Sequence, residues 1–222
     1  YNTNFTVNSD LNKYVSIGGT FNFSYKTRDE PVVGIPEVME MIFKAQSYHP
    51  TKLEDGNYGM NFFDIPGHRR FRNPLALTDE GDTDIRNIKL FLNTFAEIKL
   101  PLNIVYKLNI GLTSENERRK IFTPQITLYD AKTKEPTQIQ AGGNPYVTFA
   151  GQQRGVDQRD DKSFNWTVFN TLKWDKSFTD RTDLSILLGT SYEKFDDSFF
   201  TASNEGYLSN NLYELNAGSN NP

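Results

Sequence analysis

The sequence lacks the residue types on which several common functional sites depend. It contains no cysteine and only two histidines among 222 residues, so disulfides, thiolate metal sites and histidine-based metal catalysis have few or no ligands. No stretch approaches the ~18 consecutive apolar residues of a membrane-spanning helix. The net charge is −4, and a chain without excess positive charge lacks the electrostatic signature of nucleic-acid binding. Neither a Ser/His/Asp arrangement, nor a glycine-rich phosphate loop, nor a paired-carboxylate site is evident, so we expect no enzyme activity and no cofactor.

The sequence does contain a sustained alternation of apolar and polar side chains. Successive side chains of a β-strand point to opposite faces, so this pattern predicts strands with one apolar and one polar face. The segments reach about 10 residues or more, the length that a tilted strand needs to cross a bilayer. Aromatic residues make up 14% of the chain, which suits a membrane barrel with aromatic girdles. The clearest apolar parity comprises Val15, Ile17, Gly19, Phe21, Phe23 and Tyr25.

We predict about six long strands in three hairpins, with short turns inside the hairpins and long connections between them. The predicted strands cover residues 1–8, 14–26, 88–100, 104–112, 164–174 and 184–193, and the predicted turns cover 9–13, 101–103 and 175–181. The long connections run over about 27–87 and 114–162. Transmembrane barrels show this asymmetry, with short periplasmic turns and long extracellular loops. Soluble sandwiches instead have short strands with turns every ~8–12 residues.

Two shorter elements are predicted within these long connections. Residues 36–46 carry Pro36 at a first helical turn and apolar residues at helical spacing, which predicts one short amphipathic helix. Residues 122–129 can form a strand that extends above the membrane. The fold class predicted is therefore all-β: an antiparallel transmembrane β-barrel segment with one loop helix.

A family resemblance is carried by several short segments. They are residues 4–19 (NFTVNSDLNKYVSIGG), 21–25 (FNFSY), 28–31 (RDEP), 55–59 (DGNYG), 73–76 (NPLA), 192–195 (YEKF) and 202–207 (ASNEGY). These segments resemble barrel hairpins and outer loops of the SusC/RagA-like TonB-dependent transporters of Bacteroidota outer membranes. The resemblance covers most of the chain, whereas the signal sequence, TonB box and plug domain of that family are not among these residues.

The resemblance implies a location, a function and partners. Residues 1–222 would form part of a TonB-dependent receptor-like barrel domain in the cell outer membrane, in contact with outer-membrane lipid. The whole protein would import a nutrient of the oligosaccharide or peptide class, under a SusD-like surface lipoprotein and with energy relayed by TonB. The residue pattern alone also leaves an alternative open, a soluble or surface all-β carbohydrate-binding module.

One group of residues in the first long connection is a candidate ligand-binding site. Arginine can contact anionic groups through two parallel hydrogen bonds, and aromatic rings can stack on sugars or cations. Packing of the loop against acidic neighbours is the alternative role. The candidates are Tyr58, His68, Arg69, Arg70 and Phe71.

Two further groups of polar residues have both a functional and a structural interpretation. Those on the polar parity of the second hairpin can line a transport path, or can pair as cross-strand ions; these lumen-facing candidates are Lys89, Asn93, Glu97, Lys107 and Asn109. An acidic group can hold calcium through carboxylate oxygens, but its spacing does not match an EF-hand and a solvated loop is the alternative. The acidic group is Asp79, Glu80, Asp82 and Asp84.

Overall fold

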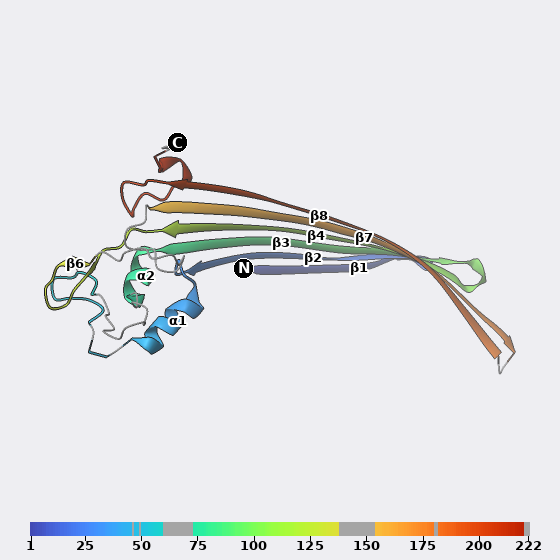
Figure 1. The fold of residues 1–222 in the computed structure, drawn as a ribbon. Coiled ribbons are helices and arrows are strands. Elements are labelled where there is room, and N and C mark those ends of the chain that lie inside the picture. The colour runs from blue at the N-terminus through green and yellow to red at the C-terminus, as the bar shows by residue number, and fades with distance from the viewer. Residues whose placement is uncertain (46, 49, 60–72, 138–153, 180–181, 220–222) are drawn as a thin grey trace. The chain divides into compact units, whose positions relative to one another are not determined.

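The chain is all-β, with six long strands in one antiparallel sheet, as the alternation predicted, and two short helices, one of which was predicted (Figure 1). The computed structural model describes residues 1–45, 47–48, 50–59, 73–137, 154–179 and 182–219. The strands follow the spatial order β1-β2-β3-β4-β7-β8, so each neighbours the next long strand in sequence. Their bounds are β1 Asn2–Asn12, β2 Val15–Glu30, β3 Asp82–Leu100, β4 Ile104–Thr123, β7 Gly155–Thr179 and β8 Thr182–Glu205.

The register of the first hairpin places apolar residues of one strand opposite apolar residues of the other, and polar residues opposite polar ones. Phe5 lies opposite Phe21, while Thr6 lies opposite Thr20, so apolar side chains share one face and polar side chains share the other. The predicted turn at 9–13 is wrong, because β1 continues to Asn12. The Asn12 side chain accepts hydrogen bonds from the backbone N–H groups of Tyr14 and Val15 at 2.8 and 3.0 Å, which closes a tighter turn than the sequence suggested.

The chain divides into two compact units. Unit 1 comprises Tyr1–Thr27, Arg86–Glu117 and Asp160–Phe200 and holds the turns and most of the length of the three hairpins. Among the described residues of this unit no side chain is buried, and apolar residues such as Phe21 and Leu90 keep 40% and 38% of their surface exposed. Its strands all belong to one sheet, so the apolar parity is not covered by a second sheet.

Unit 2 comprises Arg28–Ile85, Arg118–Arg159 and Thr201–Pro222, and it holds both helices and the buried residues of the described chain. The first core cluster contains Met41, Ala76, Leu77, Ile126 and Leu128. The second contains Phe122, Val156 and Tyr207, with Leu215 packed against it. A small two-stranded sheet, β5 (Leu128–Tyr129) and β6 (Pro136–Thr137), completes this unit.

The helix α1 (Ile35–Lys44) confirms the predicted loop helix, with Pro36 in its first turn. It buries Val38 and Met41, whereas Ile42 of the predicted apolar stripe remains half exposed. A second helix, α2 (Pro74–Glu80), was not predicted. Its signal is Asn73, whose side chain accepts hydrogen bonds from the N–H groups of Leu75 and Ala76 at 2.9 and 3.2 Å, followed by a proline in the first turn. No helix in the described residues is long and apolar enough to cross a membrane.

The strands extend beyond most of their predicted ends. The segments between hairpins therefore shrink to 31–81 and 124–154. The strands continue into stretches where most side chains on both faces are polar, so alternation gives little signal there. The predicted turn at 175–181 is also wrong, since β7 continues to Thr179. The predicted strand at 122–129 is interrupted, because Pro124 has no N–H to donate to a sheet; only β5 forms beyond it. The turn at Pro101–Asn103 is confirmed, with Leu102 and Asn103 at positive φ.

Candidate ligand-binding site

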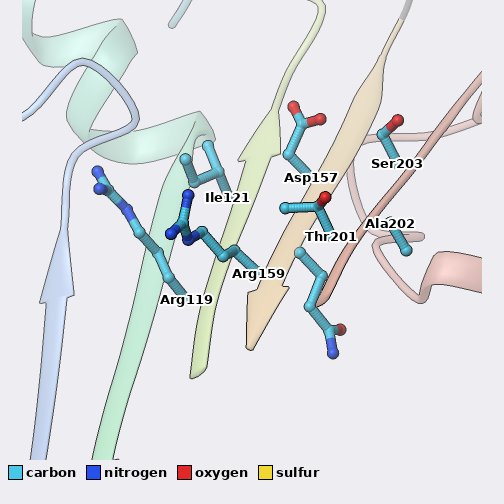
Figure 2. A pocket seen from close by; sticks show the side chains of 8 residues that line it. Arg119, Ile121, Asp157, Arg159, Thr201, Ala202 and Ser203 are labelled. Carbon is cyan, nitrogen blue, oxygen red and sulfur yellow. The ribbon is translucent and has the colours of Figure 1, made fainter. Parts of the chain in front are cut away.

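A pocket of about 250 Å³ lies at one end of three neighbouring strands, within unit 2. Figure 2 shows that β4, β7 and β8 each contribute side chains to it. Neighbouring residues of a strand point to opposite faces, so the strand ends that bury Phe122 and Val156 present Ile121 and Asp157 to the pocket. The lining residues are Arg119, Ile121, Asp157, Gln158, Arg159, Thr201, Ala202 and Ser203.

The pocket has a basic side and an acidic side. In the view of Figure 2, Arg119 and Arg159 lie on one side of the pocket, while Asp157 and Ser203 lie on the other. Burial, and then the nearby carboxylate of Glu205, raise the pKa of Asp157 above its ordinary value. Arg118, next in sequence to Arg119, donates a hydrogen bond to Gln158 at 2.8 Å.

The second core cluster and Arg154 connect the strand ends that carry the pocket residues. The Phe122 and Tyr207 rings pack edge to face, with centroids 6.5 Å apart. Arg154 donates to the side chain of Asn210 at 2.7 Å and to the Tyr207 carbonyl at 3.2 Å. These contacts hold the segment after β8 against the start of β7, which fixes the positions of the pocket residues.

Asn210 connects several parts of unit 2. Besides accepting from Arg154, it accepts from the N–H of Gln125 at 3.2 Å and donates to the carbonyl of Gln125 at 3.2 Å. It also donates to the Glu80 carboxylate at the end of α2, at 2.9 Å. One side chain thus joins α2, the segment after β4, and the start of β7.

Tyr58 packs beside the first core cluster and does not line the pocket. It packs against the cluster that contains Leu77, and its hydroxyl group donates to Asp79 and Glu80 at 3.2 and 3.3 Å. Burial and these two carboxylates raise the pKa of Tyr58 to about 12. The structure therefore gives Tyr58 a packing role; its predicted ligand contact stays a prediction.

The four acidic residues of the calcium hypothesis have two different environments. Asp79 and Glu80 accept from Tyr58. Asp82 is influenced by Asp29 and Asp84, and its pKa is raised by burial and by these two like charges. Within the part of the chain that the structure describes, no group of three or more acidic or histidine side chains is arranged to hold a metal ion.

The lumen-facing candidates in unit 1 include charged pairs between neighbouring strands. Lys89 contacts Glu115 at 2.9 Å, and Lys107 lies 4.0 Å from Glu97. The Lys107 ammonium also lies 5.0 Å from the centre of the Phe95 ring. Asn93 is exposed and Asn109 is half exposed. The paired charges agree with the cross-strand interpretation, and a transport role for these five residues stays a prediction.

The remaining predicted ligand residues, His68, Arg69, Arg70 and Phe71, lie outside the described residues. The pocket residues themselves were missed, because 114–162 was interpreted as a connection and the last predicted strand ended at residue 193. A signal was present: Arg119 and Ile121, and likewise Asp157 and Arg159, are two residues apart and so share a strand face.

No protein-family model matches the chain, and no curated protein matches it. Among solved structures, the chain is similar to a chain of the RagAB peptide transporter, with a TM-score of 0.69 and 15% identity over 99% of this chain and 23% of that chain. The RagAB peptide importer in its closed-closed and open-open states gives TM-scores of 0.64 and 0.65, with 14% and 15% identity. Each of these matches covers 98% of this chain and 23% of the other. At such identity the likeness establishes the fold.

Proposed function

We propose that the chain is part of an outer-membrane importer of the SusC/RagA type, and that unit 1 contributes a section of the barrel wall. The observation that carries this proposal is the absence of any buried side chain among the described residues of unit 1, where apolar residues alternate along long strands. In water, the apolar face of such a sheet would be exposed to solvent, which is unfavourable. In a bilayer the same face contacts hydrocarbon, and this free-energy penalty is absent.

The fold likeness supports the same proposal. The match spans nearly all of this chain but 23% of the RagAB chain, as expected of a section of a larger barrel. Import of an oligosaccharide or peptide, energy transfer from TonB and a SusD-like lipoprotein partner belong to this proposal. No catalytic step is part of it, since the importer moves its substrate without breaking a bond.

The experiment uses the full-length protein in its native cells. We expect it in the outer-membrane fraction, extractable by detergent but not by high salt or alkaline carbonate. Uptake of labelled oligosaccharides or peptides should fall when its gene is deleted and when a protonophore collapses the proton-motive force. Purification in mild detergent should recover a surface lipoprotein with it. Recovery of the protein in the soluble fraction would contradict the proposal and favour the all-β carbohydrate-binding module.

A further inference from the structure

The last residues of β7 place a lysine between two aromatic side chains. Trp174, Lys176 and Phe178 are each two residues apart, so their side chains lie on the same face of the strand. The Lys176 ammonium nitrogen lies 5.9 Å from the centre of the Trp174 ring and 4.9 Å from the centre of the Phe178 ring. Both rings attract the charge and hold it beside apolar surface. We call these three residues the lysine–aromatic cluster.

The cluster lies on the same face of the sheet as the apolar side chains of the neighbouring strands. The centre of the Trp166 ring of β7 lies 5.0 Å from that of the Tyr192 ring of β8. Asn170 of β7 accepts a hydrogen bond from the hydroxyl group of Tyr106 of β4 at 2.7 Å. Lys176 has the same parity along β7 as Trp166 and Asn170. It therefore belongs to the face that contacts hydrocarbon in the proposed function.

Trp174 fixes the depth of the cluster along this face. Its indole N–H donates a hydrogen bond to the carbonyl of Leu102 at 3.1 Å, in the turn between β3 and β4. The part of β3 and β4 that faces hydrocarbon ends at this turn, and Lys176 lies two residues, or about 7 Å, further along β7 than Trp174. Tryptophan is enriched where hydrocarbon meets the headgroups, so this position places Lys176 in the headgroup layer.

The chain does not supply an acidic partner for Lys176. Across the segments that the structure describes, Lys176 takes part in no ion pair. The adjacent Asp175 points to the opposite face of β7, where its carboxylate contacts the Lys173 ammonium group at 2.8 Å. The two aromatic rings carry no net charge, and an ammonium group has three hydrogen-bond donors. An anion from outside the chain therefore complements Lys176.

We propose that the lysine–aromatic cluster binds the phosphate of an anionic phospholipid in the leaflet beside the hairpin turns. A phospholipid carries its phosphate next to its acyl chains, which matches a cation placed at the end of an apolar face. A lipid with net negative charge is favoured over a zwitterionic lipid, whose own cationic group competes with Lys176 for the phosphate. This inference rests on the proposed function, because it requires unit 1 to face a bilayer, and it adds a specific lipid ligand.

The test places the full-length protein in phosphatidylcholine vesicles that contain a trace of phosphatidylglycerol with a photoreactive group near its phosphate. The matched probe is phosphatidylcholine with the same photoreactive group. After illumination and protease digestion, mass spectrometry measures how much of each probe is attached to residues 174–178. We expect the anionic probe to label these residues about fivefold more than the zwitterionic probe, the effect of one lysine at an anionic membrane surface. High salt should reduce this preference.

Variants then assign the preference to Lys176. Lys176→Gln should lower labelling by the anionic probe about fivefold, to the level of the zwitterionic probe. Lys176→Arg keeps the positive charge and should keep the preference. Lys173→Gln is the matched control, because it removes the same charge from the same end of β7 but from the opposite face, where both partners of the ion pair are partly exposed. It should label like wild type.

The lipid site is overturned if the two probes label residues 174–178 equally, or if Lys173→Gln lowers the preference as much as Lys176→Gln does. Hydrogen exchange in residues 164–179 identifies a variant that has lost its fold; if Lys176→Gln has, loss of the preference in Lys176→Arg overturns the site. A third lipid, photoreactive at the end of its acyl chain, should label residues 164–172. Such labelling without an anionic preference overturns the lipid site alone, whereas its absence overturns both this inference and the proposed function.

Discussion

A single amide side chain, that of Asn210, joins three segments of unit 2 through four hydrogen bonds. Replacing it by alanine leaves Arg154, Glu80 and the backbone of Gln125 without these partners. We expect Asn210→Ala to destabilise unit 2 by ~1–3 kcal/mol, the cost of leaving half-buried polar groups unsatisfied. Hydrogen exchange of the full-length protein should show faster exchange in residues 124–129 and 206–217.

The neighbouring Asn211 is the matched control for this prediction. Its side chain is exposed, and only its backbone N–H makes a described contact, with the hydroxyl group of Ser209 at 3.2 Å. Asn211→Ala should therefore exchange like wild type. Equal exchange rates in both variants would show that the Asn210 contacts add nothing to the stability of unit 2.

The hydroxyl group of Tyr58 gives unit 2 a dependence on alkaline pH. The folded pKa is about 12 and the ordinary value is 10.0, so the folded state holds the proton more tightly than the unfolded state does. The contribution of the neutral hydroxyl group to stability is complete below pH 10 and is lost as the pH rises to about 12. Tyr58→Phe should remove this part of the pH dependence in denaturant unfolding experiments at alkaline pH.

Asp79→Asn provides the companion test for Tyr58. The variant removes one of the two carboxylates that disfavour the tyrosinate anion, so the pKa of Tyr58 should fall. The difference in tyrosinate absorbance between a protein and its Tyr58→Phe counterpart reports this pKa in each background. An unchanged pKa in Asp79→Asn would mean that the charge of Asp79 does not contribute, and that burial and Glu80 set the pKa.

At the scale of single residues, sequence analysis found charges that lie on regular strands but not contacts between distant segments. Lys89, Glu97 and Lys107 could be placed on one face because parity is local information. Asn210 could not be recognised, since its partners Gln125 and Glu80 lie 85 and 130 residues away in sequence. The pocket could not be recognised either, because its side chains come from β4, β7 and β8, which meet only in the folded sheet.

At the scale of the strands, the two faces of β4 should respond differently to a buried charge. Ile110 and Asn109 are neighbours in sequence on opposite faces. If Ile110 faces hydrocarbon near mid-depth, Ile110→Arg should cost ~2–4 kcal/mol, whereas Asn109→Arg should be mild. Urea unfolding of the full-length protein in phospholipid vesicles, followed by tryptophan fluorescence, measures both free energies of unfolding. Equal tolerance at the two positions would argue against a membrane-facing sheet.

Sequence patterns located the strands well and their ends poorly. Alternation identifies a strand only where its two faces meet different environments, so it was clear over most of β2 and absent at Arg28–Glu30, where every side chain is charged. Backbone pairing continues there nonetheless. The helix α2 was missed for a related reason: seven residues are too few to show a helical period, and its capping asparagine was the remaining signal.

At the scale of the whole molecule, the two units are stabilised in different ways. Unit 2 has two clusters of buried apolar side chains. Unit 1 has no buried apolar cluster among its described residues. Its sheet ends in the edge strands β1 and β8. These strands carry exposed apolar residues such as Phe5 and Leu187, whose exposed fractions are 62% and 64%. Unit 2 therefore stabilises itself by hydrophobic burial, while unit 1 needs an apolar environment or further strands.

This difference predicts how residues 1–222 behave when they are expressed alone. An exposed edge strand offers unpaired backbone groups to other chains, and an exposed apolar face adds a hydrophobic driving force. We expect the polypeptide to self-associate in detergent-free buffer and to form smaller particles in mild detergent, as measured by size-exclusion chromatography with light scattering. A folded monomer in plain buffer, with strand-rich circular dichroism, would show instead that the apolar parity is protected within the chain itself. That result would favour a soluble all-β binding module over a section of an outer-membrane barrel.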